Sequence, residues 1–355
     1  MDLPKLRTAE TDLLYRCLAD EPPLRAVVVV ATSLVRDAVA RHHLEGAQAV
    51  ALGRGLLAGL LLATVTKGGE RVTAQILGEG GSITVDANDL GQVRGYLAVR
   101  PSARRAGSGA SGEAKDGFGG SCEAKNGSAE PGPAWRGRIP VAPLLGSEGR
   151  VVVHRDLGLK EIYQGTCSLA SGEIDEDIQR YLVESEQMPS VIRAAVLLDE
   201  AGAPSWAGGV LVQTTPGASA QALEGIASRV ENGWVERDLR GADELLPMLE
   251  DLLDQPAWIL EWRRVEFHCP CDSGRVAAAL RTLGVEDLRG ILAEEGRAEV
   301  TCHFCGRVHR VETEALASII KDMEALPNEA ASPQGAGAKV ALEPGAQLPR
   351  EKKPS

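Results

Sequence analysis

The stretches His268-Cys269-Pro270-Cys271 and Cys302-His303-Phe304-Cys305-Gly306 place a CxC pair and a CxxC pair near the end of the chain, separated by residues 272–301. Four thiolates suit the preference of zinc for soft ligands in a tetrahedral shell. Two close cysteine pairs in one chain are a strong sign of metal binding. The spacing therefore predicts one zinc ion per chain, held by Cys269, Cys271, Cys302 and Cys305.

The residues around the two pairs predict a small zinc-binding domain over 265–326. Short strands are expected at 299–301 and 307–311, with Gly306 in the turn between them. Apolar residues at helical spacing predict two short helices between the pairs and a third helix over 314–326. The residues that give this spacing are Val276, Leu280, Leu283, Leu288, Ile291, Leu292, Leu316, Ile319, Ile320 and Met323.

Most four-cysteine zinc sites are structural, so a plain zinc knuckle is the first interpretation of this domain. The chemistry nevertheless allows a switch. A domain of about 60 residues is marginally stable on its own, and structural zinc typically supplies about 10–16 kcal/mol of apparent binding energy. Each cysteine has a near neighbour in sequence, and zinc keeps the sulfurs as oxidisable thiolates. Oxidation could therefore remove the ligands and unfold the domain.

Other residues give weaker signals. His268, His303 and His309 lie beside the cysteines, but four sulfurs already fill a tetrahedral shell. His154 and Asp156 have no nucleophile motif near them, so no enzyme active site is expected. The remaining cysteines lack a near cysteine partner and are expected to be structural or incidental: Cys17 in a helix, Cys167 in a strand and Cys122 in a disordered insertion.

Residues 1–217 predict a mixed α/β domain with antiparallel sheets. A β-branched run at 27–30 precedes a helical pattern, and 46–67 predicts a long apolar helix. Turn formers join three short strands in the manner of an antiparallel meander. The strands are expected at 72–77, 82–87, 93–99, 150–154, 161–167, 191–198 and 207–213, with a further helix at 175–186.

Residues 218–264 predict a helical linker with one amphipathic stripe of leucines, between Leu245 and Leu253. A connecting helix packed on the first domain and a metastable linker are both compatible with this pattern. Residues 101–133 and 327–355 are rich in small and charged residues and are expected to be disordered. The predicted fold class is thus α+β: a mixed N-terminal domain, a helical linker and a small C-terminal zinc-binding domain.

Composition disfavours several classes of partner. A net charge of −12, without a compensating basic face, would repel nucleic acid. The most apolar stretch, 56–65, is shorter than the roughly 20 residues that span a bilayer, and residues 1–12 carry charges where a secretion signal would be apolar. We expect a cytoplasmic chain without nucleic acid or membrane partners, whose seven cysteines indicate thiol or metal chemistry before structural disulfides.

The cysteine pattern at the end of an acidic chain resembles the redox-regulated chaperone family known as the thirty-three-kilodalton heat-shock protein. The resemblance covers about residues 8–100 and 137–323. Outside the cysteines, it rests on Ala31-Thr32-Ser33, Leu52-Gly53-Arg54, Lys67-Gly68, Val85-Asp86-Ala87-Asn88, Val93-Arg94-Gly95-Tyr96, Tyr163-Gln164-Gly165, Ser185-Glu186-Gln187-Met188-Pro189, Ala207-Gly208-Gly209 and Pro216-Gly217-Ala218.

The resemblance implies an ATP-independent holdase that is inactive while it is reduced and zinc-bound. It implies that oxidation joins Cys269 with Cys271 and Cys302 with Cys305, that zinc is released, and that the small domain and the adjoining linker lose structure. The exposed surface would then hold unfolding or oxidatively damaged client proteins, and the active form would tend to form a homodimer. Cys122 lies in the insertion, outside the resemblance, and would be a competing thiol in this disulfide pairing.

Two other functions stay open on the residues alone. A zinc-stabilised structural or binding module would keep its metal under mild peroxide, although the acidic charge disfavours nucleic acid as its partner. A thiol–disulfide oxidoreductase would turn over a disulfide substrate, but its CxxC is expected at a helix start near a βαβ unit.

Overall fold

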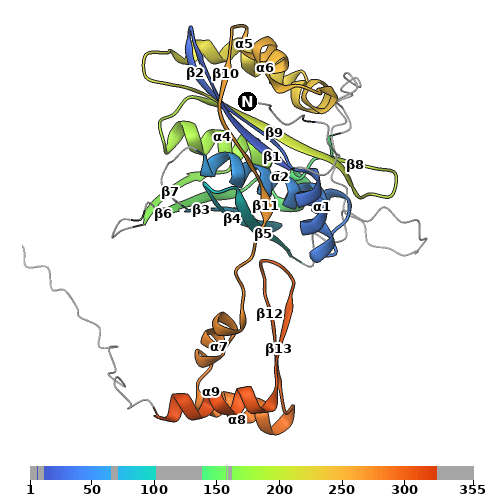
Figure 1. Ribbon diagram of the computed structural model, residues 1–355, viewed down its shortest axis with the longest axis vertical. Helices are drawn as coiled ribbons and strands as arrows, with labels where there is room; N and C mark the ends of the chain where they lie inside the picture. Colours follow the sequence, from blue (N-terminus) through green and yellow to red (C-terminus); the bar gives the residue numbers. More distant parts are fainter. Residues whose placement is uncertain are drawn as a thin grey trace, which may run out of the picture. The chain divides into compact units, whose positions relative to one another are not determined.

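The computed structural model describes residues 6, 12–64, 71–100, 138–156, 158 and 162–325 (Figure 1). The insertion and the tail predicted to be disordered, and Cys122, lie outside the described residues. The chain divides into two compact units. The first joins residues 1–272 to residues 301–309, and the second consists of residues 273–300 and 310–355. The domain boundaries expected near 217 and 264 stay predictions.

Two sheets form the frame of the first unit. One has the strand order β10-β1-β2-β9-β8 and is antiparallel. The other has the order β11-β5-β4-β3-β6-β7, in which the short β11 runs parallel to β5. Their strands are β1 (Leu13–Asp20), β2 (Pro23–Val30), β3 (Arg71–Gly78), β4 (Gly81–Asn88), β5 (Gln92–Val99), β6 (Gly149–Asp156), β7 (Tyr163–Ser168), β8 (Ser190–Leu198), β9 (Pro204–Thr214), β10 (Trp258–Arg264) and β11 (Glu266–Phe267).

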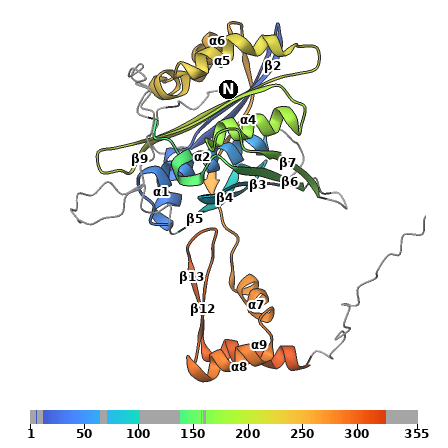
Figure 2. The same cartoon turned by 180° about the vertical axis from the view of Figure 1, so that it is seen from behind.

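Helix α2 (Gly46–Ala63) is the centre of this unit and contacts strands of both sheets (Figures 1 and 2). Its length and composition would suit a membrane span, but 83% of it is buried inside the protein. Small residues allow the close approach: a Cβ on Gly59 would lie 2.4 Å from Val85 on β4, and one on Gly53 would lie 2.8 Å from Val196 on β8. The long apolar helix predicted from the sequence is therefore a core helix.

Shorter helices surround this core. Helix α4 (Ile174–Glu184) follows β7, and its first turn together with Glu173 just before it supplies the acidic residues of a buried ionic cluster. Most of the remaining helical segments of the first unit lie in the predicted linker. Outside the linker, the shorter helices are α1 (Thr32–Arg41), α3 (Ala142–Leu145) and α4. Within it lie the 3-10 helix η3 (Ala220–Leu223), α5 (Glu224–Glu231), the π-helix η4 (Trp234–Leu239) and α6 (Leu245–Leu253).

The end of the linker and the segment around Cys17 differ from the prediction. Residues 258–264 form the strand β10, which pairs with β1, so the linker is helical only as far as α6. Cys17 lies in β1 opposite Ile259, where a helix was predicted. Both predictions were wrong because the two segments pair with each other as antiparallel strands, and no local pattern encodes the pairing of segments so far apart in the chain.

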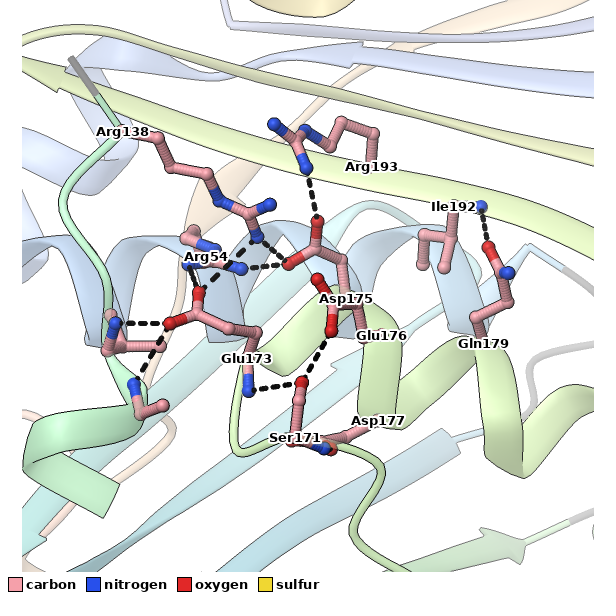
Figure 3. A network of polar contacts seen from close by, with 12 residues as sticks. Arg54, Arg138, Ser171, Glu173, Asp175, Glu176, Asp177, Gln179, Ile192 and Arg193 are labelled. Atoms are coloured by element: carbon pink, nitrogen blue, oxygen red, sulfur yellow. Dashed lines mark hydrogen bonds and ion pairs between the residues drawn. The ribbon is translucent and has the colours of Figure 1, made fainter. Parts of the chain in front are cut away.

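Arg54 is a fully buried cation in the middle of α2. Figure 3 shows that it points toward the acidic residues that precede and begin α4. Its guanidinium donates to Glu173 at 2.6 Å and pairs with Asp175, and Arg138 joins the same two carboxylates. A buried cation of this kind is tolerated only when its charge and hydrogen bonds are matched.

The cluster reaches the linker through Arg193 on β8. This guanidinium lies 3.5 Å from Asp175 and 2.8 Å from Glu236 on η4. Glu236 is only 5% exposed. The buried ion pairs therefore connect α2, the start of α4, β8 and the linker segment η4.

The second unit contains three helices around a small core, as predicted. They are α7 (Ser273–Arg281), α8 (Val285–Glu294) and α9 (Thr313–Ala325). The two-stranded sheet β12 (Ala298–Thr301) and β13 (Val308–Val311) forms where a knuckle hairpin was expected. The buried residues of this unit are Val276, Leu280, Leu288, Ala298, Leu316, Ile319 and Ile320.

Candidate metal and redox site

The two cysteine pairs reach the site from separate parts of the chain within the first unit. Cys269 and Cys271 follow β11, and Cys302 and Cys305 lie in the turn between β12 and β13. In that turn, the Cys302 amide donates to the Arg307 carbonyl at 2.9 Å, and the Gly306 amide donates to the Cys302 carbonyl at 2.8 Å. Gly306 has a φ of 68°, which glycine adopts without strain. The local sequence thus gives a tight turn that presents two sulfurs on one side.

All four predicted ligands come together. Their sulfur atoms lie within 4.8 Å of one another. The Cys269 and Cys302 sulfurs are 3.7 Å apart, and those of Cys271 and Cys305 are 3.4 Å apart. A tetrahedral shell with zinc–sulfur bonds of about 2.3 Å places its sulfurs about 3.8 Å apart. The donor set and its spacing therefore fit a four-thiolate metal site.

The electrostatic surroundings of the sulfurs are unequal. Burial alone would raise the pKa of Cys269, but hydrogen bonds from the Arg94 guanidinium, 3.7 Å away, and from the Cys271 backbone lower it. Burial raises the pKa of Cys271 to about 12 and also raises that of Cys305. A coordinated cation would hold all of them as thiolates. Without a metal, the Arg94 guanidinium stabilises the thiolate form of Cys269.

The neighbouring histidines do not take ligand positions in the sulfur cluster. Nε2 of His309 lies 3.3 Å from the Cys271 sulfur. The ring of His303 lies 6.0 Å from that of Tyr96, and Nδ1 of His268 lies 4.0 Å from Glu266. His309 therefore contacts a sulfur that four-cysteine coordination already uses.

Sequence reasoning did not single out the β5 residues beside the cluster. Arg94 contacts Cys269 from a position 175 residues earlier in the chain. In the sequence, Val93-Arg94-Gly95-Tyr96 is distinctive only as part of the family resemblance. No local pattern around Arg94 indicates a role at the sulfurs, because that role depends on the parallel pairing of β11 with β5.

Cys17 and Cys167 are both buried in strands. Burial raises the pKa of Cys17 to about 12 and that of Cys167 to about 11. The thiolate is the reactive form, so the raised pKa leaves Cys17 far less ionised, and far less reactive, than a free thiol near neutral pH.

We expect iodoacetamide at pH 7.5 to leave Cys17 and Cys167 unmodified in the native, reduced chain. Peptide mass spectrometry would measure the labelling, with the denatured chain as the control in which both residues react. Native labelling of either residue at the rate of an unstructured thiol would contradict this assignment.

The chain is similar to known proteins over most of its length. The family model described as Hsp33 protein matches residues 12–312. The chain is 38% identical over 323 residues to the 33 kDa chaperonin of Cyanothece sp., covering 88% of this chain and 98% of that protein. It is 33% identical over 322 residues to the 33 kDa chaperonin of Gloeobacter violaceus, covering 88% and 96%.

A solved structure shows the same architecture. The crystal structure of the 33 kDa chaperonin of Thermotoga maritima superposes with a TM-score of 0.71 at 26% sequence identity. The match covers 88% of this chain and 99% of the other. These findings confirm the resemblance drawn from the sequence: the chain belongs to the Hsp33 family of chaperones.

Proposed function

We propose that this chain is a redox-regulated, ATP-independent holdase, inactive when reduced and zinc-bound. Its sensor would be Cys269, Cys271, Cys302 and Cys305, the ligands of one zinc ion. The single observation that carries the proposal is the gathering of these four sulfurs within 4.8 Å of one another. Family membership supports the chaperone role and a function other than catalysis.

Oxidation would remove the ligands in pairs. When bound, zinc would hold the four sulfurs as thiolates in one tetrahedral shell. Joining Cys269 to Cys271 by peroxide forms one S–S bond and withdraws two electrons, which with two protons reduce the peroxide to two molecules of water. Joining Cys302 to Cys305 consumes a second peroxide in the same way. With no thiolates left, the metal would be released.

The sulfur contacts at 3.7 and 3.4 Å join one motif to the other. They do not fix the disulfide pairing, because every sulfur of a tetrahedral shell is a near neighbour of the others. Pairing within each motif is proposed because both partners then belong to one short loop. Its closure requires no rearrangement between the two motifs.

The consequence for the fold would be local. The second unit has a core of seven buried apolar residues, which is small for independent stability. We propose that this unit and the linker at 218–264 lose structure after oxidation, while the core of 1–217 keeps its fold. The apolar surface that becomes exposed would bind unfolding or oxidatively damaged proteins in the cytoplasm, and the active form would be a homodimer.

Light scattering of a heat-unfolding client enzyme tests this function. The chain would be added reduced with zinc, or after peroxide treatment at mild heat. We expect suppression of aggregation only by the oxidised form. A matched variant in which Cys17 and Cys167 are serine should switch like the unmodified chain. Zinc retained under peroxide, with no suppression by either form, would favour a purely structural zinc module.

A further inference from the structure

The cysteine turn of 302–306 rests on the side chains of β5. The ring of Phe304, inside the CxxC motif, meets the ring of Tyr96 edge-on at 5.3 Å. The Arg94 guanidinium carbon lies 4.1 Å from the centre of the same Phe304 ring. Aromatic pairs and guanidinium–ring stacks at such distances are attractive. Phe304 is therefore held on two sides by residues of one strand.

The backbone of the turn is held by the end of α1. Nε2 of His42 donates to the Phe304 carbonyl at 3.1 Å. Gly306 approaches the Arg41 carbonyl so closely that a Cβ there would lie 2.6 Å from the oxygen. The turn is thus fixed against two elements of the first unit, through a side chain and through its backbone.

Arg94 connects this contact to the other cysteine pair. Its guanidinium is fixed by the buried Asp86 on β4 at 2.7 Å. While stacked on Phe304, it also donates to the Cys269 sulfur at 3.7 Å. One side chain therefore touches the ring between Cys302 and Cys305 and a sulfur of the CxC pair.

We propose that Arg94, Tyr96 and Phe304 form a seat that positions the cysteine turn and slows its oxidation. A disulfide between Cys302 and Cys305 needs sulfurs about 2.05 Å apart, well below the spacing of about 3.8 Å in a tetrahedral zinc shell. The turn between them must change shape to close this gap. Because Phe304 lies within the turn, its contacts resist that change. The rate effect rests on the proposed redox function, whereas the seat itself belongs to the reduced chain.

Tyr96→Ala is the main test, since this change lies outside the cysteine motif. In the reduced, zinc-loaded chain, we expect the amides of 302–306 to exchange with deuterium about 3- to 10-fold faster. Peroxide should release zinc about 3- to 10-fold faster, measured with a chromogenic metal indicator. The separate variant Tyr96→Phe keeps the ring, so its exchange rate and its rate of zinc release should equal those of the unmodified chain. Tyr163→Ala removes an exposed tyrosine on β7 and should change neither.

A double variant makes the test specific for the contact. Phe304→Ala removes the contact with Tyr96 and also the stack with Arg94, so the double variant Tyr96→Ala, Phe304→Ala should be little faster than Phe304→Ala alone. The seat is disproved if Tyr96→Ala exchanges like the unmodified chain, if Tyr96→Phe fails to restore the rates, or if the two single effects multiply. If peroxide releases no zinc from the unmodified chain, the redox function fails, and deuterium exchange still decides the seat.

Discussion

Replacing Cys302 by serine is expected to abolish zinc binding and to unfold the second unit. A serine hydroxyl is a poor substitute for a soft thiolate, and structural zinc sites typically contribute about 10–16 kcal/mol of apparent binding energy. The core of this unit holds seven buried apolar residues, which cannot offset a loss of that size. The backbone amides of helices α7, α8 and α9 should therefore lose their protection from deuterium exchange.

Zinc stoichiometry by mass spectrometry and deuterium exchange over 273–325 would measure this effect. Cys167→Ser, at a buried cysteine on β7 outside the cluster, is the matched control and should keep one zinc per chain. Protected helices in a zinc-free Cys302→Ser variant would show that the second unit folds without the metal.

Replacing Arg54 by methionine is expected to destabilise the first unit by about 3–5 kcal/mol, because removing one partner of a buried ion pair leaves uncompensated charge. Arg54 is fully buried, and its loss would leave Glu173 and Asp175 short of a cation. Methionine keeps much of the volume, so the cost would come mainly from charge and hydrogen bonding.

Urea unfolding followed by circular dichroism would measure this loss. Arg180→Met provides the control, because Arg180 pairs with Glu184 at an exposed position four residues away. Solvent-exposed ion pairs contribute little to stability, so the control should unfold close to the unmodified chain. Equal unfolding midpoints for the two variants would mean that the buried cluster adds no net stability.

The elements with strong local patterns were predictable from the sequence. The glycine-spaced apolar run of α2, the meander β3-β4-β5 and the amphipathic helices of the second unit all carry their period in the sequence. The four sulfurs were predictable because metal ligation constrains residue type and spacing together. In each case the residues that form the pattern lie within a few tens of positions of one another in the sequence.

Features that depend on distant partners were not predictable in this way. Strand β10 forms the end of the predicted helical linker and pairs with β1, which lies near the start of the chain. Arg94 reaches Cys269 only because β11 adds to the sheet beside β5. The ion pair of Arg193 with Glu236 joins elements that no local pattern connects. Such contacts arise from tertiary packing, and sequence periodicity does not encode them.

The division of the chain into units has a consequence for protein engineering. Both cysteine pairs belong to the first unit, so residues 273–300 lie between the two halves of one cysteine cluster. The entropy of loop closure varies slowly with loop length. A chain in which a shorter flexible link replaces residues 273–297, with β12 kept, should therefore still collect four thiolates and bind zinc with unchanged stoichiometry. The helices α7 and α8 would then be dispensable for collecting the four sulfurs, because the contacts of Arg94, Tyr96 and His42 with the cysteine segments stay in place.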